Sequence, residues 1–307
     1  MIDAYIWGEH TRMSPEAPVP VVDVMKRDAR LGGAANVALN IKSSGGTPIV
    51  LTVLGAKGRA HEFLSLMEVE GMSSVGLVQS EERRCTVKTR VISNDKHMMR
   101  VDEEDLHPLS GREEEKLVLS FERLIKEESI GAIILQDYNK GVLTPAVITT
   151  VIEQAEKLGI PVMVDPKKAN FLTYENCTLF KPNLKELREG LGIELSTIDC
   201  ASLDSAVDLL KSKMPHRYTL ITLSEHGVYW NDGENSGIIP VFERNIVDVS
   251  GAGDTVISLA SLALASGVNL EQASLIADLG GGLVCEEVGV QPIRKALLKK
   301  EIEDLKL

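Results

Sequence analysis

The chain lacks paired cysteines and long apolar runs. Its four cysteines are scattered, with no C-x-x-C pair, which argues against a disulfide framework or a zinc site and favours reduced thiols in a cytoplasmic protein. The longest uncharged run, Thr255–Leu270, is too short and too rich in serine for a good membrane span. Asp3 follows the start almost at once, without an apolar h-region, so we expect no signal peptide.

Positive charge and metal-binding patterns are also scarce. A net charge of −12 argues against nucleic acid or an anionic membrane as the main partner. The six histidines show no metal-ligand spacing, and most of them should be solvated. Neither a Gly-x-x-x-x-Gly-Lys-Ser/Thr loop nor a Gly-x-Gly-x-x-Gly motif occurs, so neither a Walker-type site nor a dinucleotide site is supported.

From about residue 110 onwards, apolar segments alternate with segments of helical periodicity. The predicted helices are Glu113–Glu128, Thr144–Leu158 and Leu203–Lys213, and the predicted strands are Gly131–Gln136, Ile160–Val164, Cys177–Phe180 and Tyr218–Leu223. Alternation of helices with fully apolar strands predicts a mostly parallel sheet covered on both faces. Polar residues follow the carboxyl ends of these strands, where open α/β sheets bind ligands. They are Asp137, Asp165, Asn183 and Ser224.

The pattern before residue 110 is different. Val19–Val24 and Cys85–Ile92 alternate as exposed strands do, and Met98–Val101 is a further candidate. A helix that begins near Gly32 and a strand over Ile49–Leu54 lie between them. We expect lid strands over about 5–31 and 84–103, which form a small sheet that closes over substrate and excludes water.

Asp248–Thr255 places a glycine-rich turn directly before a small-residue, apolar segment that should be a buried helix. Backbone N–H groups of such a turn and the helix dipole form a site for anions. Phosphoryl transfer to a hydroxyl fits, because Asp254 can take the hydroxyl proton while the amides of Gly251, Ala252 and Gly253 hold the charge on the moving phosphoryl group. Its place at a helix N-terminus should make Asp254 a weak base. An ordinary helix cap is the alternative.

Three other patterns each have a structural and a functional interpretation. Gly32-Gly33 with Asn36 opens a helix, and either packs that helix or lets a ligand approach the backbone. Asn183 and Glu186 are three apart on a first helical turn, so they either form a capping box or hold Mg²⁺ through water. Lys88 and Arg90 lie at i and i+2 on a lid strand, either as edge-strand charges or as a grip for a phosphate on the substrate. For Arg100 we favour the edge-strand interpretation.

The order of these motifs resembles that of the ribokinase-like (PfkB) sugar kinases. Gly32–Asn36 resembles the first signature of this family and Gly251–Asp254 the second. Further segments resemble the branch that phosphorylates D-glycero-β-D-manno-heptose 7-phosphate at O1 with ATP, towards the heptose of bacterial lipopolysaccharide. These segments are Thr11–Val22, Thr89–Ile92, Asp137–Gly141, Val164–Lys167 and Val249–Val256. The similarity covers essentially the whole chain.

The resemblance implies a single ribokinase-like kinase domain over residues 1–307, dimeric through its lid, with ATP, Mg²⁺ and a phosphorylated sugar as ligands. It implies catalysis by Asp254 with Gly251, Ala252 and Gly253. The residues implied for the nucleotide and its metal are Asn183, Leu184, Lys185, Glu186, Ser224, Gly227 and Asp248, of which Asn183 and Glu186 serve Mg²⁺. The residues implied for the sugar phosphate are Asp3, Gly32, Gly33, Asn36, Lys88, Arg90 and Lys140.

The chain departs from the family in three respects. Asp278 stands where relatives typically carry Asn beside the nucleotide. No His-x-Gly-His of a nucleotidylyltransferase occurs, so only the kinase step is expected. An apolar strand that relatives have before Asp3, the first central strand of the sheet, is missing, and we expect the natural protein to start upstream of Met1.

Two alternatives remain from the sequence. The first is another kinase of this fold, acting on fructose phosphate or a nucleoside. The second is a catalytically silent protein that binds sugar or nucleotide.

Overall fold

The larger part of the molecule is built on a six-stranded sheet. The computed structural model describes residues 1–94 and 96–305. The strand order is β12-β11-β10-β9-β8-β7, in which β7 (Ile133–Gln136), β8 (Val162–Asp165), β9 (Leu179–Phe180) and β10 (Tyr218–Thr222) are parallel. Strands β11 (Val228–Asn231) and β12 (Ser236–Ile239) continue it as antiparallel neighbours. The parallel sheet predicted from the apolar segments is confirmed.

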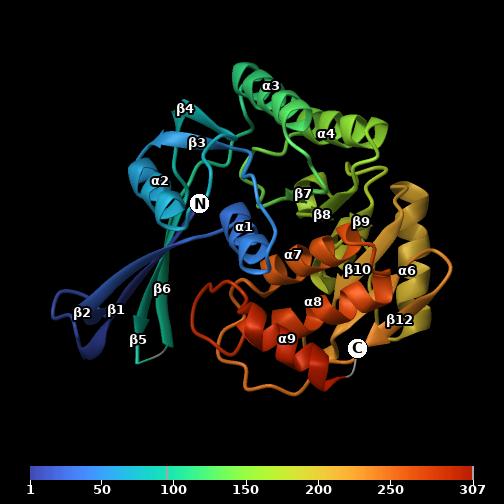
Figure 1. The fold of residues 1–307 in the computed structure, drawn as a ribbon. Helices are drawn as coiled ribbons and strands as arrows, with labels where there is room; N and C mark the ends of the chain where they lie inside the picture. The colour runs from blue at the N-terminus through green and yellow to red at the C-terminus, as the bar shows by residue number, and fades with distance from the viewer. Residues whose placement is uncertain (95, 306–307) are drawn as a thin grey trace.

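Helices cover both faces of this sheet (Figure 1). Successive side chains of each strand point to opposite faces, so neighbouring apolar residues of one strand pack against different helices. Phe180 and Ile221 pack into one apolar cluster with α3 (Gly111–Glu127), α4 (Pro145–Lys157) and α6 (Cys200–Lys213). Their neighbours Leu179 and Leu220 pack into a second cluster with α7 (Ala252–Ala265) and α8 (Leu270–Val284). Helix α9 (Lys295–Asp304) adds Leu298 to the second cluster.

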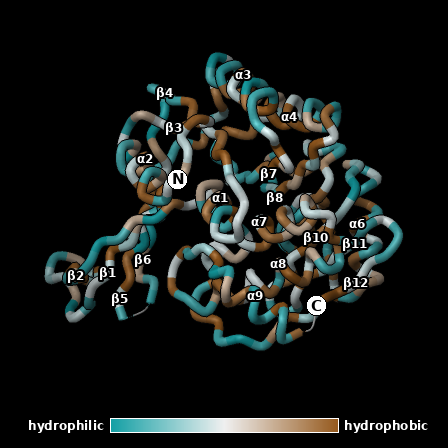
Figure 2. The backbone as a smooth tube through the Cα atoms, viewed as in Figure 1, coloured by the Kyte–Doolittle hydropathy of each residue, from teal (hydrophilic) through white to brown (hydrophobic). Residues whose placement is uncertain are grey.

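The predicted lid is a separate four-stranded sheet with the order β2-β1-β5-β6. Strands β1 (Ile2–Met13) and β2 (Pro20–Leu31) form one hairpin, β5 (Val87–Ser93) and β6 (Lys96–Glu103) form another, and β1 pairs parallel with β5. The lid projects from the body at the lower left of Figure 1. Figure 2 shows hydrophobic as well as hydrophilic stretches along it, and apolar residues such as Met25 and Met99 are exposed.

A third, two-stranded sheet lies between the lid and the body. Its strands β3 (Thr52–Lys57) and β4 (Leu77–Arg84) pair parallel, next to α1 (Ala34–Ser43) and α2 (Ala60–Val69). The strand predicted over Ile49–Leu54 is shifted, because β3 finds its partner β4 only from Thr52 onwards. Within the described ranges, no helix is both long and apolar enough to cross a membrane.

Candidate active site

The carboxyl ends of the parallel strands and the N-terminus of α7 meet at one place. Gly251 is the N-cap of α7 and Asp254 lies in its first turn, buried. Helix α7 packs against β8. Tyr138 follows β7, and Asn36 comes from α1, so three segments that are far apart in the sequence converge on one carboxylate.

Both oxygens of Asp254 accept hydrogen bonds. Asn36 donates from Nδ2 to Oδ2 at 2.8 Å, and the Tyr138 hydroxyl donates to Oδ1. Such contacts hold the carboxylate in one orientation, with the Gly251–Gly253 backbone beside it. The arrangement can position a base next to a set of anion-binding N–H groups.

The electrostatics of Asp254 differ from the expectation of a weak base. Burial raises its pKa to about 6, although Asn36, Tyr138 and nearby Lys181 act in the opposite direction. Desolvation of the charged form therefore outweighs the helix N-terminus and its donors. A carboxylate of this pKa is ionised at neutral pH, yet it accepts a proton more readily than an ordinary aspartate.

A buried ion pair faces the same turn, and the sequence analysis did not assign it to the site. Lys181, directly after β9, contacts Asp165 of β8 at 3.1 Å, and Gln136 donates to Asp165 at 3.1 Å. The backbone of Gly253 lies close to both Lys181 and Asp165. The sequence signal for Asp165 and Lys181 was their position at or just after the carboxyl end of a strand, and the same signal applies to Tyr138 after β7.

Asn183 and Glu186 form the capping box of α5 (Leu184–Leu191). Asn183 Oδ1 accepts from the Glu186 N–H at 2.8 Å, and Glu186 Oε2 accepts from the Asn183 N–H at 2.9 Å. The capping box, one of the two interpretations of this pair, is therefore formed in the structure. Glu186 also forms an ion pair with Lys167, whose Nζ is 4.0 Å from Asp165.

This donor set fits a magnesium ion held mainly by phosphate oxygens and water. Mg²⁺ typically takes one or two carboxylates and keeps several waters. Glu186 and Asp165 supply carboxylates joined through Lys167. Across residues 1–94 and 96–305, no group of three or more His, Cys, Asp or Glu side chains forms a dedicated metal site, so phosphate oxygens would have to complete the coordination.

The remaining residues predicted for the nucleotide lie around the carboxyl ends of β9 and β10. Asn183 bridges to Thr222 at the end of β10, and the turn Ser224–Gly227 follows there. Gly227 has φ 85°, and a Cβ atom would collide with the Ile239 carbonyl, so the turn requires glycine. Leu184 starts α5, whereas Lys185 is largely exposed and lies 3.8 Å from Glu189.

Asp3 and Asn36 border the side of the site that faces the lid. Asp3 is buried on β1 and forms an ion pair with Arg90 of β5. A Cβ atom at Gly32 would overlap the Asp3 carboxylate, which is why the chain carries glycine there. Asn36 is fully buried, and its Oδ1 has no hydrogen-bond partner among the described residues. Since buried acceptors are normally satisfied, this oxygen can receive a ligand hydroxyl.

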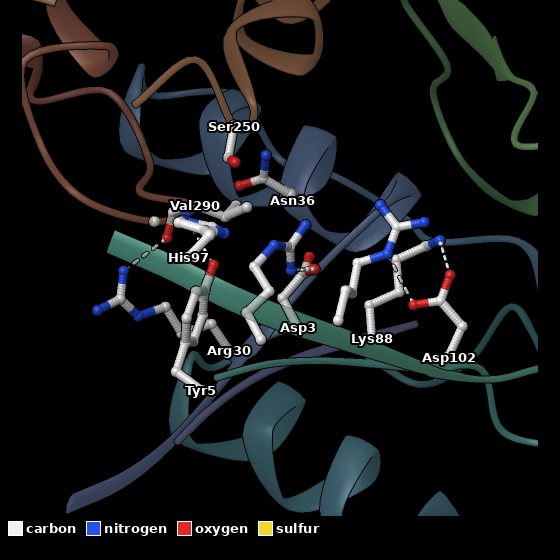
Figure 3. Close-up of polar contacts among 12 residues, drawn as sticks. Asp3, Tyr5, Arg30, Asn36, Lys88, His97, Asp102, Ser250 and Val290 are labelled. Carbon is white, nitrogen blue, oxygen red and sulfur yellow. Dashed lines mark hydrogen bonds and ion pairs between the residues drawn. The ribbon is translucent and has the colours of Figure 1, made fainter. Parts of the chain in front are cut away.

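The three predicted phosphate-binding cations are not equivalent. Lys88 lies 3.3 Å from Asp102 and 3.7 Å from Glu104, and Lys140 lies 2.7 Å from Glu104. Figure 3 shows the Lys88 ammonium directed at Asp102, away from Asn36 and Ser250. The acidic neighbours of Lys88 and Lys140 thus reduce their capacity to bind a further anion.

Arg90 is also paired, with Asp3, but unlike the two lysines it borders a cavity of about 450 Å³ between the lid and the α7 turn. The cavity is also lined by His97, Met98, Met99, Arg100, Asp248 and Ser250. Asp248 accepts N–H groups of Ser250 and Gly289 at 2.9 and 2.8 Å. Burial opposes ionisation, but these donors keep the pKa of Asp248 below its usual value. Asp248 was predicted with the nucleotide residues, yet it lies beside this lid cavity.

The lid is also joined to the body by Tyr5 and Arg30. The Tyr5 hydroxyl accepts the Val290 N–H at 2.9 Å, and Arg30 donates to the Val290 carbonyl at 3.0 Å (Figure 3). Arg30 also stacks on the Tyr5 ring. These contacts connect the base of β1 and β2 to the loop after α8.

A lidded α/β sheet with a buried carboxylate at a glycine-rich helix start fits a carbohydrate kinase. The chain belongs to the pfkB family of carbohydrate kinases, whose family model matches residues 5–296. The family assignment made from the motifs is confirmed.

Two bifunctional HldE proteins illustrate the similarity in sequence. That of Trichlorobacter lovleyi is 37% identical over 297 residues, and that of Caulobacter vibrioides is 39% identical over 299 residues. The alignments cover 96% and 97% of this chain, but only 60% and 61% of the relatives. The chain therefore spans about three fifths of the length of these proteins.

Solved structures confirm the ribokinase-like fold. Phosphofructokinase-2 from Escherichia coli, in complex with potassium, superposes with a TM-score of 0.83 at 20% identity, covering 100% of this chain and 96% of that one. Arabidopsis thaliana ribokinase, complexed with ribose and ATP, gives 0.72 at 17% identity, covering 97% and 95%.

The rate of phosphoryl transfer should depend on pH through Asp254. We expect kcat/KM to fall below a pH of about 6, because protonation removes the base. Tyr138→Phe should shift this acid limb to higher pH, since the Tyr138 hydroxyl lowers the pKa of Asp254.

Tyr174→Phe is the matched control, because Tyr174 is also buried and donates to a different carboxylate, Asp137, at 2.8 Å. A pH–rate profile of the three proteins checks this. An acid limb that Tyr138→Phe leaves in place would mean that Asp254 is not the titrating group.

Proposed function

We propose that the protein phosphorylates a sugar that already carries a phosphate, namely D-glycero-β-D-manno-heptose 7-phosphate, at O1 with ATP. The observation that carries the kinase chemistry is the buried Asp254, held by Asn36 and Tyr138 beside the Gly251–Gly253 turn. The choice of sugar is supported by the heptose-kinase motifs and by the 37–39% identity to bifunctional HldE proteins.

Asp254 acts as the general base in this proposal. It takes the proton from the sugar hydroxyl as that oxygen bonds to the γ-phosphorus of ATP and the bond to the leaving ADP oxygen breaks. The N–H groups of Gly251, Ala252 and Gly253 stabilise the charge on the transferring phosphoryl group. In a loose transition state the proton moves late, so a base with a pKa of about 6 is sufficient.

The nucleotide lies along the edge formed by the ends of β9 and β10. Asn183, Leu184, Lys185 and Glu186 at the start of α5, and Ser224 with Gly227 after β10, border the phosphates. Lys181 lies close to Gly253 and can neutralise phosphate charge. Mg²⁺, organised by Asn183 and Glu186 through water, would neutralise further charge on the phosphates of ATP.

The sugar lies between Asp254 and the lid. Asp3 and the free Oδ1 of Asn36 accept sugar hydroxyls, and Gly32 and Gly33 let the sugar approach the backbone. Arg90 binds the phosphate that the sugar already carries, because it lines the lid cavity, whereas Lys88 and Lys140 do not line it and are paired with Asp102 and Glu104.

Asp254→Asn should abolish turnover with heptose 7-phosphate, while ATP binding stays within a few-fold. Loss of a general base typically costs about 10²–10⁴ in rate. ATP consumption is measured with heptose 7-phosphate and with fructose 6-phosphate, alongside ATP binding by calorimetry. A near-normal kcat would reduce Asp254 to a helix cap, and equal kcat/KM for the two sugars would reject the heptose assignment.

Arg90→Ala should raise KM for the phosphorylated sugar by roughly 10–100-fold and leave KM for ATP unchanged, because a hydrogen bond to a charged group contributes about 1.5–3 kcal/mol. Lys88→Ala should have a smaller effect in the same direction. Steady-state kinetics with each substrate varied in turn, and a melting temperature for each variant, provide the check. Equal effects on sugar and ATP would count against phosphate binding.

We also propose a homodimer formed through the lid. Strand β6 is exposed along its whole length, and Met25, Met99 and Val101 present apolar side chains to solvent. Met99→Lys should therefore yield monomers, whereas Leu119→Lys, on the exposed face of α3, should not. Light scattering after gel filtration measures the mass. A wild-type monomer at micromolar concentration would contradict the proposal.

A further inference from the structure

Two carboxylates and two lysines form a charged cluster at the carboxyl ends of β8 and β9. Asp165 ends β8, Lys167 follows it by two residues, Lys181 follows β9, and Glu186 lies in the first turn of α5. Lys181 lies 3.1 Å from Asp165. Lys167 forms an ion pair with Glu186, and its Nζ is 4.0 Å from Asp165. The charges of these four side chains cancel, so the cluster is neutral as a whole.

Each carboxylate of the cluster has one oxygen that is held by groups other than Lys167. Oδ2 of Asp165 faces the Lys181 ammonium and accepts the Gln136 amide N–H at 3.1 Å. Oε2 of Glu186 accepts the N–H of the α5 N-cap residue at 2.9 Å. The other two oxygens, Oδ1 of Asp165 and Oε1 of Glu186, both face Lys167. The ammonium therefore lies where two otherwise free anionic oxygens converge.

A neighbouring carboxylate, Asp137, does not share this property. Its Oδ1 accepts the Asn139 N–H at 2.6 Å, and its Oδ2 accepts the Tyr174 hydroxyl at 2.8 Å. Both oxygens thus serve contacts within the fold. The position that Lys167 occupies is set by Asp165 and Glu186.

This position lies beside the turn to which we assign the phosphates. A Cβ atom at Gly253 would be 3.9 Å from Oδ2 of Asp165 and 3.9 Å from Nζ of Lys181. Mg²⁺ typically takes one or two carboxylate oxygens and completes its shell with water and substrate phosphates. The ammonium of Lys167 and a divalent cation would therefore compete for the same two oxygens.

The two lysines of the cluster differ in their freedom to move. The Lys181 side chain is only 3% exposed, whereas that of Lys167 is 34% exposed. A lysine carries its charge on a flexible four-carbon stem. Lys167 can therefore leave the two oxygens without unfolding its surroundings, and Lys181 cannot.

We propose that Lys167 occupies the divalent-cation position between Glu186 and Asp165 and keeps a free cation out until a nucleoside triphosphate binds. While the ammonium stays, the neutral cluster attracts a free cation only weakly. The phosphates of a bound nucleotide offer the ammonium new anionic partners, so Lys167 turns to them and releases both oxygens. The cation then binds together with the nucleotide and not before it. This inference rests on the proposed use of Mg·ATP at this edge, but not on the identity of the sugar.

The first test measures Mn²⁺ binding without nucleotide, through the paramagnetic resonance signal of the free ion. Mn²⁺ stands in for Mg²⁺ because both prefer oxygen ligands. Lys167→Met should tighten Mn²⁺ binding by at least about tenfold, since it leaves two anionic oxygens without a cation. Excess Mg²⁺ should displace the bound Mn²⁺. Lys167→Arg keeps the positive charge and should bind Mn²⁺ as weakly as the wild type.

Lys168→Met is the matched control, because Lys168 is the next residue, is exposed and carries the same charge. Equal gains in Lys167→Met and Lys168→Met would reflect net charge alone and overturn the proposal, as would no gain in either. Melting temperatures establish that the variants are folded. If Lys167→Met is destabilised, Lys167→Gln removes the charge with a polar side chain and the same tightening is expected.

A double variant tests where the cation binds. Glu186→Gln added to Lys167→Met should cancel the gain in Mn²⁺ affinity, because glutamine keeps an acceptor for the N-cap N–H but carries no charge. A gain that persists in the double variant would place the cation elsewhere, and the proposal would fail.

A further measurement follows the ammonium to the nucleotide. Calorimetry with ATP and a metal chelator should show roughly tenfold weaker ATP binding in Lys167→Met, because the variant has no ammonium for the phosphates. ATP should also tighten Mn²⁺ binding more in the wild type than in Lys167→Met. Equal coupling in the two proteins would refute the displacement. None of these readouts needs a sugar or turnover, so a failed heptose assignment would leave them unchanged.

Discussion

The structure of the site depends on the burial of one carboxylate. Asp254 is removed from water at the N-terminus of α7, and two side chains from distant segments, Asn36 and Tyr138, hold its two oxygens. These contacts fix α1, the end of β7 and α7 relative to one another. Asn40, one turn after Asn36, continues the connection, since its Oδ1 accepts from the Thr255 hydroxyl and from the Ile293 N–H. The polar groups of α1 therefore join the two signature motifs into a single unit.

Competing effects on the Asp254 pKa decide what this unit can do. The helix N-terminus, Asn36, Tyr138 and Lys181 favour the ionised form, and burial disfavours it more strongly. Lys181 cannot act fully on Asp254, because its closest partner is the Asp165 carboxylate, at 3.1 Å. The resulting pKa of about 6 leaves the group ionised at neutral pH and still able to take a proton. An exposed aspartate in the same sequence motif would lack this property.

Much of the fold follows from local patterns, whereas the partners of individual side chains do not. The apolar segments at β7, β8 and β10 predicted the parallel sheet, which is confirmed, since strand length and side-chain period are local properties. The edge at which we propose that ligands bind follows from the same pattern. The sequence could not distinguish Lys88 from Arg90, which share one strand and one face, because their tertiary partners differ: Lys88 meets Asp102 and Glu104, whereas Arg90 meets Asp3 and lines the lid cavity. It placed Asp165 at a strand end but missed its partner Lys181, because their pairing depends on the order of β8 and β9 in the sheet. The weak-base expectation for Asp254 failed because burial is set by the whole fold.

The start of the chain lies between an apolar cavity of about 560 Å³, which Met1 lines together with side chains of β3 and β7, and the proposed sugar side of the site, where Asp3 lies. Met1 reaches Gly33, and Asp3 lies against Gly32, so the Gly32–Gly33 turn contacts the start of β1 twice. Asp3 in turn neutralises Arg90, and Arg90 lines the lid cavity. A displacement of Met1, which lines the cavity, would therefore also affect Asp3 and its ion pair with Arg90. Direct contacts of this short segment therefore connect the wall of the apolar cavity, at Met1, with the ion pair of Asp3 and Arg90.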